Sequence, residues 1–132
     1  MRRTFADTFY FLALLNKHDE AHARALEYAQ YVDQLATTEW VLTELADGLA
    51  SSRQREMFVV TRQEMLDDVN VLVVRFDNDL HEEGVRLYAD RPDKQWSLTD
   101  CISFVVMKRE GLHEALTGDH HFEQAGFVAL LK

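Results

Sequence analysis

Four acidic side chains stand where elements of predicted secondary structure begin or end, or within a helical segment. Asp7 and Asp119 each follow a short apolar run, Asp100 stands near the start of a helical segment, and Glu44 lies within another. Burying an ionised carboxylate costs several kcal/mol unless a partner meets its charge. Carboxylates packed together also raise one another's pKa values. We therefore expect these acids, if they converge, to share a bound cation.

The chemistry of such a site follows from its ligand atoms. Carboxylate oxygens favour Mg²⁺ or Mn²⁺, whereas Zn²⁺ prefers imidazole and thiolate ligands. Acidic clusters that hold divalent metals characteristically hydrolyse phosphodiesters, because the metals generate hydroxide, orient the phosphate and stabilise the leaving oxygen. The acids thus favour a metal-dependent phosphodiesterase.

The elements that would position these acids alternate between strand and helix. Runs of apolar and β-branched residues predict strands at residues 3–6, 35–37, 70–76, 114–117 and 127–130. Apolar residues at helical spacing predict helices near residues 9–15, 19–31, 40–49, 53–68, 78–90, 97–111 and 120–124. We expect Thr8 to cap the first helix. The unbroken apolar strand at 70–76 is expected to be buried on both faces.

This alternation predicts the fold class. We expect an α/β fold, a three-layer sandwich with a mostly parallel central sheet and right-handed crossovers. Ligands of open α/β sheets bind beyond the carboxyl ends of the strands, which is where Asp7 and Asp119 are expected. Without a visible linker or repeat, residues 1–132 are interpreted as a single domain.

Composition narrows the class of protein further. With 47% hydrophobic residues, five glycines and one proline, the chain is typical of an ordered globular protein. The one cysteine, Cys101, excludes an internal disulfide and fits a reducing compartment. No apolar run approaches the roughly 20 residues of a membrane-spanning helix, and the first residues lack a secretory signal. We therefore expect a cytoplasmic protein.

Net charge argues against broad binding of nucleic acid. The chain carries a formal charge of −9, with 23 acidic and 14 basic residues, and such a surface repels phosphate backbones. Acids that converge on divalent cations would invert the local field and attract phosphates at that point. Basic residues on either side of the helix with Asp100 are hypothetical phosphate contacts, namely Arg91, Lys94, Lys108 and Arg109.

An ordered set of motifs resembles PIN-domain proteins, especially the VapC-type ribonuclease toxins. The resemblance is carried by Asp7-Thr8, by TTEWVLTEL ending at Glu44-Leu45, by WSLTDCISFVVM around Asp100 and by ALTGDHHFEQAGF around Asp119. It extends from about Arg3 to Leu131, and the order of the motifs is more specific than any one of them.

What the resemblance implies is a metal-dependent endoribonuclease with Mg²⁺ or Mn²⁺ as cofactor. By this resemblance, the acidic site would consist of Asp7, Glu44, Asp100 and Asp119, with Thr8, Ser97, Thr99 and Thr117 as supporting polar residues. It further implies an RNA substrate, a cognate antitoxin that covers the site, and a homodimer. PIN domains also occur in RNA-processing factors, and a non-catalytic module with an acidic groove for a basic partner would explain the net charge without chemistry.

Each acid also has a purely structural interpretation. Asp7 would cap the first helix, Asp100 would be favoured by the helix dipole, and Asp119 would be a turn residue after Gly118. Glu39 is the rival of Glu44, which we prefer because it lies deeper among apolar neighbours.

The remaining motifs favour structural roles. The segment HDEAH, residues 18–22, resembles a zinc-protease motif and a helicase box, but it lacks a third ligand and a phosphate-binding loop, so both resemblances are interpreted as chance. His120 and His121 are expected at a surface turn, although a neutral histidine there would be able to orient water or phosphate. Cys101 is expected to be a buried thiol.

Overall fold

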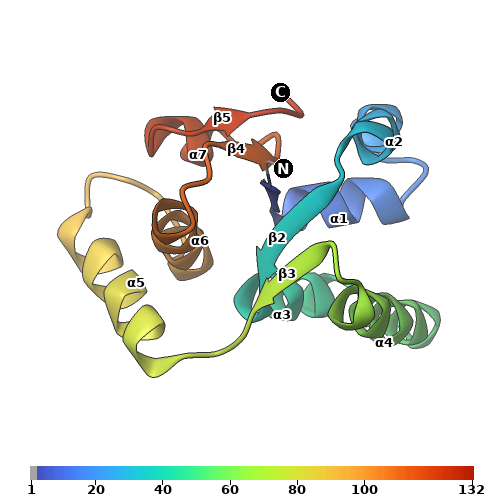
Figure 1. The fold of residues 1–132 in the computed structure, drawn as a ribbon, viewed down its shortest axis with the longest axis horizontal. Coiled ribbons are helices and arrows are strands. Elements are labelled where there is room, and N and C mark those ends of the chain that lie inside the picture. Colours follow the sequence, from blue (N-terminus) through green and yellow to red (C-terminus); the bar gives the residue numbers. More distant parts are fainter. Residues whose placement is uncertain (1–2) are drawn as a thin grey trace.

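Five parallel strands form the centre of the protein in the computed structural model, which describes residues 3–132. Figure 1 shows the sheet, whose strand order is β3 (Val71–Val74), β2 (Gln34–Thr38), β1 (Arg3–Ala6), β4 (Glu114–Leu116) and β5 (Val128–Ala129). Every pair of neighbouring strands is parallel, and Phe5 is in register with Ala36 on one side and Ala115 on the other. The predicted sheet is confirmed, and it is parallel throughout.

Helices cover both faces of this sheet. Those that follow β1 and β2 are α1 (Thr8–Leu15), α2 (His22–Tyr31), α3 (Glu39–Gly48) and α4 (Ser52–Asp67). Those that follow β3 and β4 are α5 (Asn78–Asp90), α6 (Leu98–Arg109) and α7 (His120–Gln124). The connections from β1 to β2 and from β2 to β3 run along the sheet in one direction, and those from β3 to β4 and from β4 to β5 run in the opposite direction. Right-handed crossovers therefore place the two groups of helices on opposite faces of the sheet. Figure 1 shows this arrangement, which confirms the three-layer sandwich.

Close packing between α5 and α6 fixes the helix that carries Asp100. A side chain at Gly84 of α5 would collide with Ile102 of α6, so only glycine allows this approach. Phe104 and Phe122 then pack edge to face, with ring centroids 5.0 Å apart, and join α6 to α7. Both phenylalanines are buried. The start of α6 is thereby held against the core.

Some expectations about individual elements are corrected by the structure. β3 is an edge strand whose four residues are half-buried, so the prediction of burial on both faces is wrong. α2 begins at His22 because the Asp19 carboxylate accepts the backbone N–H of Ala21 and holds a turn before it. Asp7, not Thr8, is the N-cap residue of α1. Within the described residues, no helix has the length and apolar character needed to cross a membrane.

Candidate active site

The carboxyl ends of β1 and β4 meet at the point where the chain connections diverge to opposite faces of the sheet. Ligands of open α/β sheets bind at such switch points. A cleft of about 490 Å³ opens there, and its lining comprises Asp7, Thr8, Phe9, Glu44, Gln95, Ser97, Asp100, Asp119 and His121. The structure thus brings together all four acids that the sequence singled out. Thr8 and Ser97 join them, whereas Thr99 is not among the lining residues.

Asp7 is a buried acid with a raised pKa. It follows β1 as the N-cap residue of α1, but its side chain makes no capping hydrogen bond. Its Oδ2 accepts a hydrogen bond from Thr117 Oγ1 at 3.0 Å, and the residue is 5% exposed. Burial raises the pKa of Asp7 to about 7, and the negative charges of Asp100 and Glu44 add to that effect. The carboxylate is therefore held in the cleft and is not used as a cap.

Asp100 is fixed by the first turn of α6. Its Oδ2 accepts the backbone N–H of Ser97 at 3.2 Å, while the Ser97 hydroxyl accepts the backbone N–H of Asp100 at 3.0 Å, which is a reciprocal capping box. Burial, followed by the charge of Asp119, raises the pKa of Asp100; the hydrogen bond from Ser97 and the contact with His121 oppose this. The sequence SLTD thus places a buried carboxylate at a helix start.

Glu44 and Glu39 have different environments. Thr8 Oγ1 donates a hydrogen bond to Glu44 Oε1 at 2.5 Å across the cleft. Glu39 is buried and its Oε1 lies 2.7 Å from Arg62 Nη2 and 3.0 Å from Arg75 Nε. The carboxylate of Glu39 is therefore already neutralised by two arginines, and only Glu44 faces the cleft.

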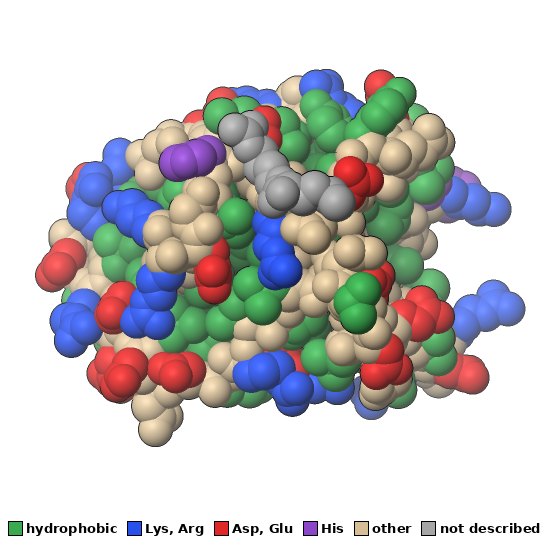
Figure 2. Space-filling model, in the orientation of Figure 1, with side chains coloured by type: hydrophobic (Ala, Val, Ile, Leu, Met, Phe, Trp, Pro, Cys, Tyr) green, Lys and Arg blue, Asp and Glu red, His purple; other side chains and the backbone are tan. Residues whose placement is uncertain are grey.

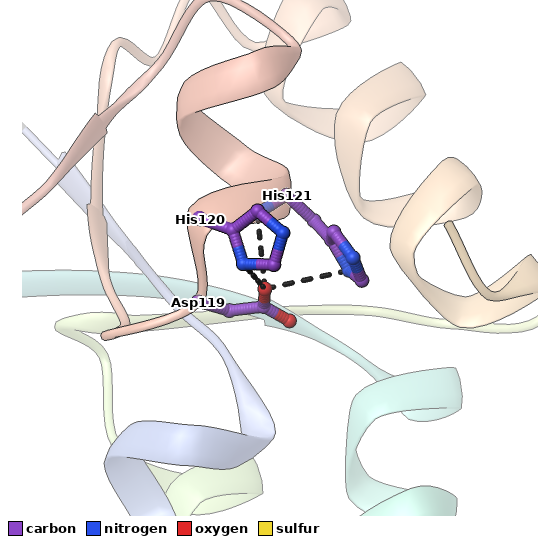
Figure 3. A group of neighbouring side chains, drawn as sticks. All are labelled: Asp119, His120 and His121. Carbon is purple, nitrogen blue, oxygen red and sulfur yellow. Dashed lines mark hydrogen bonds and ion pairs between the residues drawn. The ribbon is translucent and has the colours of Figure 1, made fainter. Parts of the chain in front are cut away.

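Asp119 and the two histidines after it form a compact group (Figure 3). Asp119 caps α7, because its Oδ1 accepts the backbone N–H of His121 at 2.9 Å. His121 Nδ1 lies 3.3 Å from Asp119 Oδ1 and 3.2 Å from Asp100 Oδ2, so this imidazole bridges two of the acids. His120 Nδ1 lies 3.7 Å from Asp119, and its side chain is 63% exposed.

The expectation of a surface turn therefore holds for His120 and is wrong for His121, whose side chain is 19% exposed. The position of His121 was predictable from the sequence, because the second residue after an N-cap aspartate donates its backbone N–H to that carboxylate. The side chain of such a residue starts close to the capping acid. Asp119 and His121 have this spacing.

The donor atoms of the cleft fit a divalent cation held by oxygen. As far as residues 3–132 define it, the lining has four carboxylates and neither lysine nor arginine to neutralise them. Among residues 3–132, one group of three potential ligands has all its donor atoms within 4.8 Å of one another. It consists of Asp119, His120 and His121. Asp7, Glu44 and Asp100 are not part of that set, and they line the same cleft as Asp119.

Phe9 and Gln95 also line the cleft, and the sequence analysis did not identify them. Phe9 gave no signal, because it lies in an apolar run like any core residue. Its partner is Gly118, where an added Cβ would lie 2.5 Å from Phe9 Cζ. This glycine permits the close approach of a ring to the loop before Asp119.

The basic residues are divided between two regions. Arg91 and Lys94 line a second cavity, which shares Gln95 with the acidic cleft. Lys108 lies eight residues after Asp100 on α6, about 12 Å along the helix axis, and Arg109 pairs with Glu83 at 2.6 Å. The expectation that these last two lie beside the acids is wrong.

Two further sequence expectations concern residues outside the cleft. Cys101 is a buried thiol, as predicted, and burial raises its pKa to about 11. In the HDEAH segment, His22 Nδ1 lies 2.7 Å from the carbonyl oxygen of Ala13. That histidine therefore joins α2 to α1, which agrees with the interpretation of the motif as chance.

Comparison with known proteins shows the family: residues 4–128 match the PIN domain, and the chain belongs to this family. The 23S rRNA-specific endonuclease VapC20 of Mycobacterium tuberculosis is 30% identical over 125 residues, which cover 94% of this chain and 95% of the relative. The crystal structure of VapC20, described as a Sarcin-Ricin loop cleaving toxin, has a TM-score of 0.84 at 28% identity and covers 95% and 96% of the two chains. VapBC2 of Rickettsia felis, bound to a promoter DNA fragment, shares the fold with a TM-score of 0.65 at 16% identity over 96% of each chain.

Proposed function

We propose that this protein is a divalent-metal-dependent endoribonuclease and the toxin of a type II toxin–antitoxin pair. In this proposal residues 1–132 act as one PIN-like domain. The observation that carries the proposal is the convergence of four acids, from four separate parts of the chain, on one cleft at the switch point of the sheet. Membership of the PIN family and the full-length similarity to a named endonuclease support it.

Asp7, Glu44, Asp100 and Asp119 are the residues that would hold the ion, and their oxygen donors favour Mg²⁺ or Mn²⁺. When bound, such a cation would supply the positive charge that activates water and stabilises the phosphate. Thr117, Thr8 and Ser97 position three of the acids through the hydrogen bonds described above. Thr99 is not among the lining residues of the cleft and stays in the proposal only as a polar residue in the first turn of α6.

The raised pKa of Asp7 supports this role. A carboxylate with a pKa of about 7 is half protonated near neutral pH, and a cation in the cleft would favour its ionised form. On binding a metal ion, the buried site would therefore release the proton of Asp7. This exchange makes metal affinity rise with pH.

For the substrate, we propose RNA, with 23S ribosomal RNA as the first candidate because VapC20 is named for it. An antitoxin that covers the acidic cleft is the proposed partner, and a homodimer is the proposed assembly. Size-exclusion chromatography of the protein alone and with its antitoxin measures both associations.

Cleavage of a 23S rRNA fragment containing the sarcin–ricin loop tests the activity. We expect cleavage by the purified protein with Mg²⁺ or Mn²⁺, and its loss in excess chelator. Asp7→Asn and Asp100→Asn are expected to remove it, because each keeps the shape of the side chain and loses the charge. Cleavage that survives chelator or both substitutions would reject the proposal. Growth arrest on expression, relieved by the antitoxin, separates a toxin from an RNA-processing enzyme.

A further inference from the structure

A second cavity, of about 480 Å³, lies beside the acidic cleft. Gln95 lines both, so the two hollows are adjacent at this residue. The other lining residues of this cavity come from the end of α5, from the segment that joins it to α6, and from α6 itself: Tyr88, Ala89, Arg91, Pro92, Lys94, Trp96 and Cys101. Two cations and two aromatic rings thus lie next to a cleft that has four carboxylates.

Arg91 is held in one orientation. Its Nε and Nη2 donate to the two carboxylate oxygens of Asp93 at 3.0 and 2.9 Å, a bidentate pair. The guanidinium carbon lies 5.2 Å from the centroid of the Trp96 ring. Trp96 is itself buried, and its Nε1 donates to Gln124 at 3.0 Å. The guanidinium plane is therefore pre-organised at the cavity wall, and Asp93 takes only two of its five N–H donors.

Tyr88 provides an accessible ring at the same cavity. It is 53% exposed, in contrast to the buried Trp96. Lys94, half-buried, also lines this cavity. Figure 2 shows that Lys and Arg side chains gather on the side of the molecule formed by α5, although acids lie among them.

We propose that this cavity is a nucleotide-binding subsite for unpaired RNA. It takes the nucleotide next to the scissile phosphodiester, with the base stacked on Tyr88 or on the Arg91 guanidinium and its phosphate bound by Lys94. Aromatic rings and guanidinium planes are the groups on which splayed-out RNA bases stack. This inference rests on the proposed function, because the acidic cleft defines where the scissile bond lies.

The charges favour the same assignment. A strand that crosses the acidic cleft meets carboxylates, and at the neighbouring nucleotide it meets the ammonium group of Lys94 beside the Arg91–Asp93 ion pair. Attraction to phosphate at this place offsets the repulsion from a chain with net charge −9. The subsite also predicts a preference for loops over duplexes, since a base must leave its stack to enter the cavity.

Binding of a single-stranded RNA oligonucleotide tests the subsite without cleavage. We would measure fluorescence anisotropy in chelator with the full chain carrying Asp100→Asn. Tyr88→Ala is expected to weaken binding by about 5- to 160-fold, the value of one base stacked on an aromatic ring. Tyr88→Phe keeps the ring and is expected to retain affinity. Tyr31→Ala removes a more exposed tyrosine on α2, 71% exposed, and is expected to change nothing.

Lys94→Gln provides an independent readout. Loss of one phosphate contact is expected to reduce the slope of log affinity against log salt concentration by about 0.7 for a single strand. Lys108→Gln makes the same change of charge at the far end of α6 and is expected to leave the slope unchanged. A fall in affinity equal for Tyr88→Ala and Tyr31→Ala, or equal slopes for the two lysine variants, would overturn the subsite.

The same materials separate this inference from the proposed nuclease. Metal-dependent cleavage by the wild-type protein, together with unchanged RNA binding in the Tyr88 and Lys94 variants, would reject the subsite and leave the nuclease in place. RNA binding that depends on Tyr88 in a protein that never cleaves would reject the nuclease and support an RNA-binding role for the cavity.

Discussion

Thr117 donates a hydrogen bond from Oγ1 to Oδ2 of Asp7 at 3.0 Å, although 110 residues separate the two in the sequence. The bond joins the carboxyl ends of β1 and β4, both of which are buried. The same hydroxyl accepts the backbone N–H of Asp119 at 3.1 Å. One threonine therefore contacts two acids that follow neighbouring strands, and the cleft depends on a group that does not itself line it.

Thr117→Val tests this relationship with little change of volume. Without the hydroxyl, the buried Asp7 carboxylate and the Asp119 N–H lose a partner, and we expect a loss of stability of about 1–3 kcal/mol. We also expect weaker Mn²⁺ binding by calorimetry, because two ligands lose their orientation. Thr37→Val is the matched control: Thr37 is equally buried and donates to the Ala6 carbonyl. Equal Mn²⁺ affinity in both variants would contradict a positioning role.

Substitution of Glu44 is expected to lower activity, and substitution of Glu39 is expected to lower stability. Glu39→Gln removes the charge that meets Arg62 and Arg75, and we expect a loss of about 2 kcal/mol by urea denaturation. Cleavage by the folded protein is expected to persist. Glu44→Gln is expected to lower cleavage at least tenfold with little effect on stability, because its main partner is the Thr8 hydroxyl. The reverse pattern would assign Glu39 to the site.

His121 is expected to matter far more than its neighbour. Its Nδ1 contacts Asp100 and Asp119, so His121→Ala frees both carboxylates, and we expect a 10- to 100-fold loss of metal affinity. His120→Ala changes an exposed ring 3.7 Å from Asp119 and serves as the control. A thermal-shift titration with Mn²⁺ measures both. Equal losses would indicate that both imidazoles bind the ion, as the geometry of their group allows.

Much of the fold was predictable because its signals are local. Alternating strands and helices, the proline after α5 and the capping sequence before α6 fix the elements, and parallel pairing brings Asp7 and Asp119 to one edge. The edge position of β3 was not predictable in this way. Its apolar residues predict burial on both faces, and only the order of the sheet shows that one side of the strand lacks a neighbour.

The four acids of the site were identified from their positions relative to the predicted helices and strands and from the family resemblance. The residues around them could not be identified without the three-dimensional structure. Nothing in the apolar run after Asp7 marks Phe9 as a cleft residue. The bridge from His121 to Asp100 joins residues 21 apart, and it depends on how α6 and α7 pack. The prediction that Lys108 and Arg109 lie beside the acids was wrong because it relied on their nearness to Asp100 in sequence. They lie at the opposite end of the helix from Asp100.

Asp7→Asn is expected to stabilise the metal-free protein while removing its activity. The pKa of Asp7 lies at about 7 in the native state against 3.8 for an ordinary aspartate, so the native state binds this proton more tightly than the unfolded state. Below about pH 4 both states are protonated and the group has no effect. As pH rises to 7, only the unfolded state ionises, and the free energy of unfolding falls by about 4 kcal/mol.

Asparagine cannot ionise, so the difference in stability between Asp7→Asn and the wild type should grow in favour of the variant from pH 4 to above pH 7. Urea denaturation in chelator measures this difference at each pH, and the comparison cancels the titration of groups that do not interact with Asp7. Mn²⁺ at pH 7.5 should reverse the order, because only the wild type exchanges the proton of Asp7 for the cation. A difference that stays constant with pH would show that Asp7 is not a buried, cation-demanding acid, and the proposed metal site would lose its central ligand.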